Sequence, residues 1–229
     1  MNDLAQNLIE ELQCETVFTI PVLGGIPVSE AVVVTWIIMA VLVVIAFILT
    51  RNLKVDHISK RQAVAESIVT GLMNMVQGMV GEKGKAYVPY LTTVMLYIGV
   101  SNIIGLFGFK SPTKDLRVTV ALALMSIILI EAAGIYHKGV KRWLHGFVEP
   151  VAIVTPINIL EVVTKPLSLC MRLFGNVLGA FVIMELLKMI LPVGLPVVFS
   201  LYFDIFDGLL QAYVFVFLTS LYIDCLLYT

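Results

Sequence analysis

The chain has 229 residues, of which 59% are hydrophobic and only 14% are charged. Because an average soluble protein has about 25% charged residues, this composition identifies an integral membrane protein. The 15 Lys and Arg are balanced by 16 Asp and Glu, and the net charge of -1 gives no electrostatic basis for binding nucleic acid. The three cysteines form no CxxC pair and have no histidine at metal-ligand spacing, so the sequence predicts neither a metal site nor a disulfide framework.

The first 30 residues are predicted to form an external segment that stays in the mature chain. They include acidic residues but no Lys or Arg, whereas a cleavable signal peptide needs a basic start. The next twenty residues, 31–50, carry no charge and at about 1.5 Å per residue cover roughly the 30 Å hydrocarbon core of a bilayer. They are predicted to form the first spanning helix, with Ser29 as its N-cap.

A basic stretch and a polar helix follow this span. Residues 62–85 mix apolar residues with Glu and Gln, a pattern typical of an amphipathic helix at the membrane surface. Residues 86–109 and 118–136 are two further apolar blocks, the second interrupted only by Glu131. These blocks are predicted to be the second and third spans.

The last eighty residues are apolar but contain several ionisable groups, and they divide at the LPVGLP sequence of residues 191–196. Two long helices are predicted, at about 155–190 and 197–227. Each exceeds the thickness of one bilayer, so each must tilt or lie partly along the membrane plane. The predicted fold class is therefore an all-α integral membrane protein with about five hydrophobic helices, the last two long and tilted, and a surface amphipathic helix.

The distribution of Lys and Arg among the short loops predicts the orientation, because cytoplasmic loops are enriched in these residues. With the N-terminus outside, nine of them (in 51–85 and 137–149) lie inside and three (in 110–117) lie outside. Five crossings then place the C-terminus in the cytoplasm. The chain is predicted to be a single membrane domain, with the external segment over 1–30, three spans and their loops over 31–149, and the ion-path helices over 150–229.

Charged residues inside the membrane are concentrated in the last two helices. An Arg or Asp at mid-membrane costs about 2.5 to 3.5 kcal/mol, so such residues normally face the protein interior or a watery cavity and mark a transport path. Along its helix Arg172 lies about 16 Å from Glu161 and about 20 Å from Glu185, which places it near mid-membrane.

Small and polar residues share the helix face of Arg172. Gly175, Asn176 and Gly179 follow it by three, four and seven residues, so a close partner surface is predicted on this face. The alternative is a glycine-lined helix contact in which Arg172 forms an ion pair within the chain.

The last helix has a polar face of its own. Asp204, Asp207 and Gln211 are spaced i, i+3 and i+7, which on an α-helix places them on one face leading from the outer end toward the middle. Asp224 lies about 30 Å from Asp204 and belongs at the opposite interface, where a carboxylate in the headgroup region is the simpler interpretation.

The segment from Thr155 to Ala180 resembles the signature of subunit a of the F-type ATP synthases, whose core reads KP-x-SL-x-x-RLFGN. Lys165-Pro166, Ser168-Leu169 and the run from Arg172 to Asn176 match this core. Three further segments are similar to other parts of the same family, in the same order: SNIIGLFGF at 101–109, PTKDLRVTVALAL at 112–124 and LLQAYVFVFLTSLY at 209–222.

The resemblance implies the stator half of a rotary membrane motor. In that family subunit a abuts a rotating ring of c subunits and supplies two offset aqueous half-channels, one from each membrane face. Arg172 matches the essential arginine, Asn176 and Gln211 match its polar neighbours, and Gly175 and Gly179 would face the ring. A positive charge in low dielectric favours the ionised form of a passing c-subunit carboxylate, which must collect another proton before it re-enters lipid.

One departure from the family concerns the outer half-channel. Many members place an acid nine residues after the arginine and a histidine seven residues before the glutamine, whereas this sequence has Phe181 and Asp204 there. Glu185 lies one turn beyond Phe181 and Asp207 one turn beyond Asp204, so Glu185, Asp204 and Asp207 are predicted to replace the missing pair as an acidic cluster.

The inner half-channel is predicted at the cytoplasmic end of the Arg172 helix. Asn158, Glu161 and Lys165 lie within two turns there, Ser168 is one turn below the arginine, and these polar groups can hold a short file of water. The alternative is an ordinary interfacial ion pair between Glu161 and Lys165 that anchors the helix. Lys165 and Lys188 can also extend to the interface without any role in transport.

The resemblance also implies the partners and the setting. The expected partners are the c-subunit ring, the peripheral-stalk b subunits, the rest of the ATP synthase and the lipid of a bacterial plasma membrane. The chain itself is expected to translocate ions without a catalytic site, cofactor or nucleotide site. The sequence leaves protons and sodium open, because the ring's own binding site chiefly decides between them.

Two other classes of protein remain as alternatives. A secondary transporter or channel with an intramembrane ion-pair site would ordinarily show internal repeats, and none is evident. A structural membrane anchor would not need several ionisable residues in its last two helices.

Overall fold

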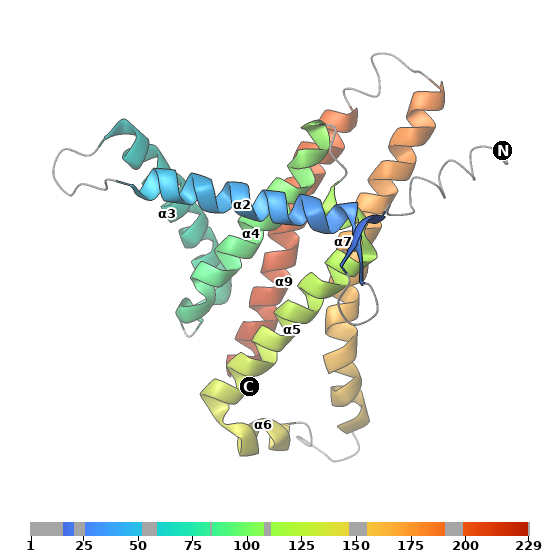
Figure 1. The fold of residues 1–229 in the computed structure, drawn as a ribbon. Coiled ribbons are helices and arrows are strands. Elements are labelled where there is room, and N and C mark those ends of the chain that lie inside the picture. Colours follow the sequence, from blue (N-terminus) through green and yellow to red (C-terminus); the bar gives the residue numbers. More distant parts are fainter. Residues whose placement is uncertain are drawn as a thin grey trace.

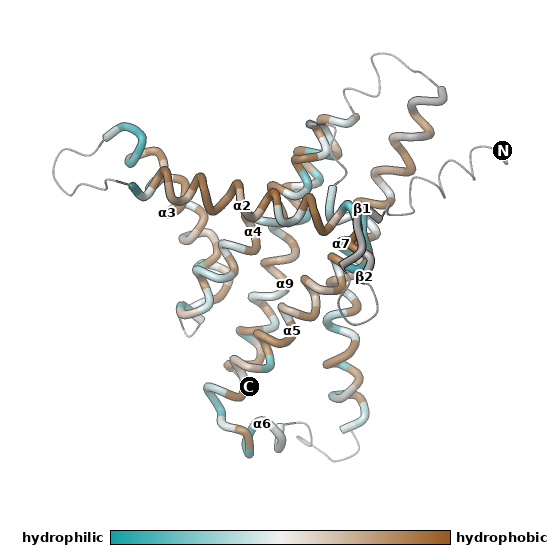
Figure 2. Tube along the Cα trace, in the orientation of Figure 1, coloured by the Kyte–Doolittle hydropathy of each residue, from teal (hydrophilic) through white to brown (hydrophobic). Residues whose placement is uncertain are grey.

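A computed structural model of the chain describes residues 16–20, 26–51, 59–82, 84–107, 111–146, 155–190 and 199–228. Within these residues, six helical stretches are long and apolar enough to cross a membrane. They contain α2 (Glu30–Thr50), α3 (Lys60–Val80), α4 (Val88–Ile103), α5 (Leu116–Lys138), α7 (Thr155–Ile190) and α9 (Gly208–Tyr228) (Figure 1). Figure 2 shows that apolar residues dominate these helices, most continuously in α2. The all-α membrane fold predicted from the sequence is confirmed.

Short elements connect these helices. They are β1 (Thr16–Ile20), β2 (Ile26–Ser29), η1 (Lys85–Tyr87), η2 (Ile104–Phe107), η3 (Pro112–Lys114), α6 (Val140–Gly146) and the π-helical segment η5 (Tyr202–Asp207). β1 and β2 pair as an antiparallel hairpin, which is not among the elements predicted from the sequence. The β-branched residues of TVFTI, with a Gly-Gly pair before IPVS, are the local signal that favours a hairpin there.

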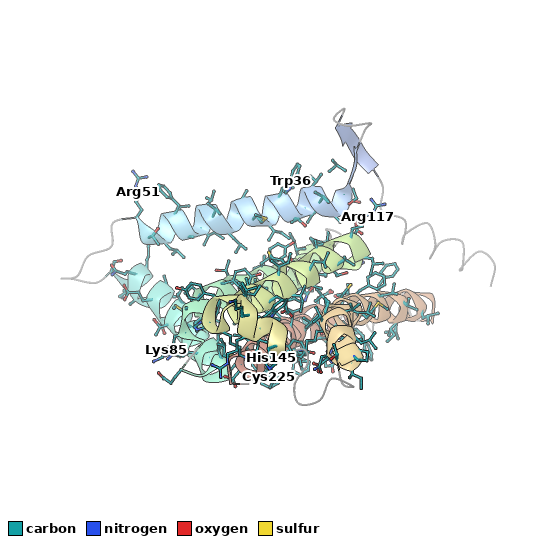
Figure 3. The ribbon with its side chains drawn as sticks, turned by 90° about the horizontal axis from the view of Figure 1, so that it is seen from below. Trp36, Arg51, Lys85, Arg117, His145 and Cys225 are labelled. Carbon is teal, nitrogen blue, oxygen red and sulfur yellow. The ribbon has the colours of Figure 1, made fainter. Side chains whose placement is uncertain are left out.

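α2 forms a layer of its own beside the other helices (Figure 3). Only Ala31, Val34 and Ile38 of this helix are buried, and Trp36 on its outer side points away from the other helices. Its 21 residues measure about 32 Å, the thickness of a bilayer core. Such a long exposed apolar surface suits contact with lipid.

The prediction that Ser29 is the N-cap of α2 is confirmed in position but not in its hydrogen bonding. Ser29 occupies the N-cap position, but its side chain makes no capping hydrogen bond. Its hydroxyl instead donates to Oδ2 of Asp115 at 3.0 Å, across 86 residues of sequence. The buried Ser29 therefore ties the start of α2 to the start of α5.

α9 lies at the centre of the helix packing. It contacts α4 most extensively and also packs against α3, α5 and α7. The hydrophobic core draws buried residues from all five helices, including Val76 of α3, Ile98 of α4, Leu173 of α7 and Phe215 of α9. Burial of these aliphatic and aromatic side chains fixes α9 relative to its neighbours.

α7 is the longest described helix, with 36 residues and a length of about 54 Å. In Figure 1 α7 and α9 run across the direction of α2, so these helices cannot all be parallel to the membrane normal. The predicted long helix over 155–190 is confirmed, whereas the tilt of the last two helices in the membrane stays a prediction.

α3 corresponds to the predicted surface helix. Most of it is exposed, and only Gln62, Val76 and Val80 are buried. Figure 1 shows that α3 lies near the C-terminal end of α2 and runs across its direction. By length and composition α3 also qualifies as a span, so the described residues contain six candidate spans where the sequence predicts five and a surface helix. The position of α3 at the surface stays a prediction.

The second and third predicted spans differ from the structure mainly at their ends. α4 stops at Ile103, and η2 continues the chain in a tighter helical turn. α5 extends from Leu116 to Lys138, beyond the predicted 118–136, because Asp115 caps it by accepting a hydrogen bond from the Arg117 amide at 2.9 Å.

Candidate functional site

Arg172 lies in the middle of α7 with an exposed side chain. It forms no ion pair with any side chain in the part of the chain that the structure describes. The predicted alternative, in which Arg172 is neutralised within this chain, therefore finds no support among the described residues. A cation on a membrane helix without an internal counter-ion is available to a group outside the chain.

The helix face beside Arg172 is open. Gly175 is exposed and Gly179 is half-buried, and a Cβ atom added to either would meet no heavy atom within 4 Å. These glycines therefore make no close contact with another described helix of the chain. The free space allows the backbone of a partner helix to approach α7 closely.

Asn176 and Gln211 join α7 to α9. Nδ2 of Asn176 donates to Oε1 of Gln211 at 2.6 Å. Gln211 is 2% exposed, and its Nε2 has no hydrogen-bond partner among the described residues. The structure thus brings together two of the polar residues singled out from the sequence, one helical turn beyond Arg172.

The acidic residues of the last helix do not lie on a regular α-helix. Asp204 and Asp207 both belong to the π-helical segment η5, and Gln211 follows in α9. Because π-helical bonding widens each turn, residues three apart no longer stack as they do on an α-helix. The i, i+3 and i+7 spacing therefore no longer places Asp204, Asp207 and Gln211 on one face by itself, and their common face stays a prediction. Both carboxylates are half-buried.

Phe181, which stands where many family members have an acid, is covered by a cation. Nζ of Lys114 lies 4.2 Å from the centroid of the Phe181 ring. Lys114 comes from η3, between α4 and α5, and the sequence alone predicts no function for it beyond its loop charge. The contact between Lys114 and Phe181 could not be predicted from local spacing, because 67 residues separate them in the sequence.

Other predicted site residues lie toward the ends of the same helices. Nζ of Lys165 lies 3.4 Å from Oε2 of Glu161, and the same ammonium lies 5.5 Å from the Tyr222 ring of α9. The ion pair predicted as an alternative is thus present. Ser168, between this pair and Arg172, is exposed. Glu185 lies in the last turns of α7, with its side chain outside the described part of the structure, as is that of Lys188.

The fold and the site define a membrane protein of several long helices with a central arginine on an open helix face. Residues 32–224 match the family model described as the ATP synthase A chain, so the chain belongs to that family. It is 35% identical to ATP synthase subunit a of Moorella thermoacetica, over 88% of this chain and 92% of the relative. It is 30% identical to ATP synthase subunit a 1 of Crocosphaera subtropica, over 85% of each chain. It is also 34% identical to the sodium ion specific ATP synthase subunit a of Propionigenium modestum, over 87% of this chain and 74% of that relative.

These similarities decide between the classes of protein that the sequence left open. The chain is a membrane subunit of an ATP synthase, and the other subunits of that complex are its partners. The transporter and anchor interpretations are set aside, because the match covers nearly all of the chain, including every long helix.

Proposed function

We propose that the chain is the stator subunit a of a rotary ATP synthase and that Arg172 acts on carboxylates of a rotating c-subunit ring. The observation that carries this proposal is the exposed Arg172 on the open face of Gly175 and Gly179. A membrane-embedded cation that faces outward needs an external counter-charge, and a mid-membrane carboxylate on an adjacent ring supplies it.

The electrostatics of this contact explain how rotation is coupled to ion flow. A guanidinium in low dielectric stabilises the ionised carboxylate, so each ring site loses its proton as it passes Arg172. The site must be neutralised again before it returns to lipid, because a bare charge is costly there. Arg172 also separates the two half-channels, since its positive charge repels protons that would otherwise leak straight across.

The Asn176 and Gln211 pair supports Arg172 in this proposal. Their 2.6 Å hydrogen bond holds α7 and α9 in register next to the arginine. Gln211 is almost fully buried, so its end of this bond is shielded from water, which strengthens the bond. The pair therefore keeps the Arg172 face at a constant distance from the ring.

The outer half-channel is proposed to run past Glu185, Asp204 and Asp207 to Gln211. The half-burial of Asp204 and Asp207 supports this route, because carboxylates in a membrane helix require water or polar neighbours. The irregular backbone of η5 supports it as well, since π-helical turns free backbone groups to bind water and occur frequently at functional sites.

The inner half-channel is proposed at Asn158, Glu161, Lys165 and Ser168. Glu161 is exposed, and Lys165 is less exposed because it packs between Glu161 and Tyr222. These groups lie at the end of α7 that faces the cytoplasm if the N-terminus is outside, as the positions of Lys and Arg predict. The proposed location is a bacterial plasma membrane, with b subunits contacting the surface that α2 and its neighbours leave free.

The proposal is tested by removing the charge of Arg172. Arg172→Ala should abolish ATP synthesis driven by a proton gradient in reconstituted complexes and leave the amount of assembled complex close to wild type. Assembly is expected to survive because Arg172 contacts no counter-ion among the described residues. Arg172→Lys should restore little activity, since a compact ammonium lacks the guanidinium fork and can lose its proton in low dielectric.

Arg142 supplies the matched control. It is an exposed arginine on α6, away from the open face, and Arg142→Ala should leave synthesis at the wild-type level. Vigorous coupled synthesis by Arg172→Ala complexes would refute the role of Arg172.

A further inference from the structure

Asn102 of α4 bonds to the backbone at the end of the π-helical segment η5. Its side chain is buried, and its Nδ2 donates to the carbonyl oxygen of Gly208 at 2.9 Å, across 106 residues of sequence. The backbone N–H of the same Gly208 donates to the carbonyl oxygens of Phe203 and Ile205. The bond to Phe203 spans five residues, which is the pattern of a π-helical turn. Asn102 therefore holds the residue that closes the last π-helical turn.

Buried hydroxyl groups fix the direction of the Asn102 amide. The hydroxyl of Thr113, which is fully buried, donates to Oδ1 of Asn102 at 2.8 Å. Oγ of Ser111 lies 2.7 Å from Oγ1 of Thr113 and 2.8 Å from the carbonyl oxygen of Ser101, to which it donates. Because the amide oxygen accepts from Thr113, the amide NH₂ group is the end that is directed to Gly208.

The end of α4 and the start of η2 also pack closely against η5. A Cβ atom added to Gly208 would lie 2.8 Å from Cβ of Asn102, and one added to Gly105 would lie 3.3 Å from Oδ1 of Asp204. The two glycines, one on each side of the contact, therefore allow a close approach that larger residues would prevent. These contacts hold η5 at two points, Asp204 and Gly208.

The helical register of η5 decides where its side chains point. A π-helical turn contains about one residue more than an α-helical turn, so relaxation to an α-helix would rotate the residues before Gly208 by about 100°. Ile205 would then take the place of Asp204. Because π-helical turns are rare and short, this register needs support from tertiary contacts.

We propose that Asn102 is a positioning residue of the outer half-channel. Its hydrogen bond to Gly208 keeps η5 in the π-helical register, and this register keeps the carboxylate of Asp204 in the ion path. The inference rests on the proposed outer half-channel. Asn102 does not bind the ion, because its amide is occupied by Thr113 and Gly208. Loss of this buried hydrogen bond should change the ratio of the two registers by about tenfold.

The test measures how fast single cysteines in η5 of assembled complexes react with a membrane-impermeant thiol reagent added on the side of the N-terminus. Asp204→Cys and Ile205→Cys are each placed in a chain without its three native cysteines. With Asn102 present, Asp204→Cys should react faster than Ile205→Cys. Asn102→Leu has a similar volume but no donor, so it should lower the rate for Asp204→Cys about tenfold and raise the rate for Ile205→Cys.

Thr92 supplies the matched control. It is another buried polar residue of α4, but its hydroxyl donates to the carbonyl oxygen of Val88 in the same helix at 2.8 Å. Thr92→Val should therefore leave both labelling rates unchanged. If Asn102→Leu does not assemble, Asn102→Ser replaces it, since the serine hydroxyl is one bond shorter than the amide and does not reach Gly208.

A second measurement connects the register to ion flow. In vesicles that contain the membrane sector without its catalytic head, and with Asp204 and Ile205 unchanged, Asn102→Leu should lower passive proton flux per assembled complex about tenfold. Thr92→Val should conduct like wild type.

The absence of a shift in reactivity from Asp204→Cys to Ile205→Cys, or an unchanged flux in Asn102→Leu complexes, would overturn the positioning role and leave the proposed function intact. If neither cysteine reacts from this side while Asn102 is present, the proposed outer half-channel is refuted, and the inference with it.

Discussion

Replacement of Gly179 by leucine tests whether this face of α7 packs within the subunit or contacts the c-subunit ring. A Cβ atom added to Gly179 would meet no heavy atom within 4 Å, so a leucine side chain there starts in open space within the subunit. If the ring approaches α7 at this glycine, the same substitution removes the space that the ring needs. The prediction is a subunit that is fully stable and a motor that is slowed or does not assemble with its ring.

The expected change in the stability of the subunit follows from the surroundings of each glycine. Leucine is a better helix former than glycine by roughly 0.5 to 1 kcal/mol, so Gly179→Leu should keep or slightly raise the stability of the isolated subunit. Gly208 is the matched control, since a Cβ there would lie 2.8 Å from Cβ of Asn102. Such overpacking typically costs about 1 to 3 kcal/mol, so Gly208→Ala should destabilise the subunit itself.

The assay has two stages. Thermal unfolding of the purified subunit in mild detergent should give an unchanged or higher melting temperature for Gly179→Leu. Gly208→Ala should melt lower by about 2 to 12 °C, because each kcal/mol shifts the melting temperature of a chain of this size by about 2 to 4 °C. Ring association and ATP synthesis are then measured in the complex, where Gly179→Leu should fail. Wild-type turnover in Gly179→Leu complexes would show that this face does not meet the ring. A loss of subunit stability as large as that of Gly208→Ala would show instead that the leucine clashes within the subunit.

The remaining predictions concern the two half-channels. Glu161→Gln should reduce passive proton flux per assembled complex, and it should hardly change assembly, because partly exposed ion pairs such as Glu161 with Lys165 stabilise proteins by about 0 to 1 kcal/mol. Glu82→Gln breaks a similar exposed pair outside the channel and should change neither the flux nor the assembly. Reduced assembly with normal flux for Glu161→Gln would support the anchoring role of the Glu161 pair. A single cysteine in place of Asp207, in a chain without its three native cysteines, should react with a membrane-impermeant thiol reagent from outside, and one in place of Lys141 should react from the cytoplasm. Labelling of both from the opposite sides would reverse the proposed orientation.

The helices of this protein could be predicted from the sequence, because each depends on its own run of apolar residues. The length of α2 and its end at Thr50 follow from an uninterrupted hydrophobic stretch, and the extent of α7 follows from a largely apolar segment that ends before LPVGLP. The open face of Arg172, Gly175 and Gly179 could also be predicted, since an α-helix places residues three, four and seven apart on one side. The hairpin of β1 and β2 has a local sequence signal, but it was not predicted, because the prediction followed the long apolar spans.

Only the tertiary structure decides which distant segments meet. Lys114 lies on Phe181, Asn102 binds the backbone of Gly208, and the hydroxyl of Ser29 is directed to Asp115 instead of capping its own helix. Each of these contacts joins groups that are remote in sequence. The π-helical turns around Asp204 also depend on tertiary structure, because a wider helical turn is retained only where tertiary contacts compensate for its poorer local geometry. Local periodicity determines which side of a helix a residue occupies, but the residue that it faces depends on how the helices pack.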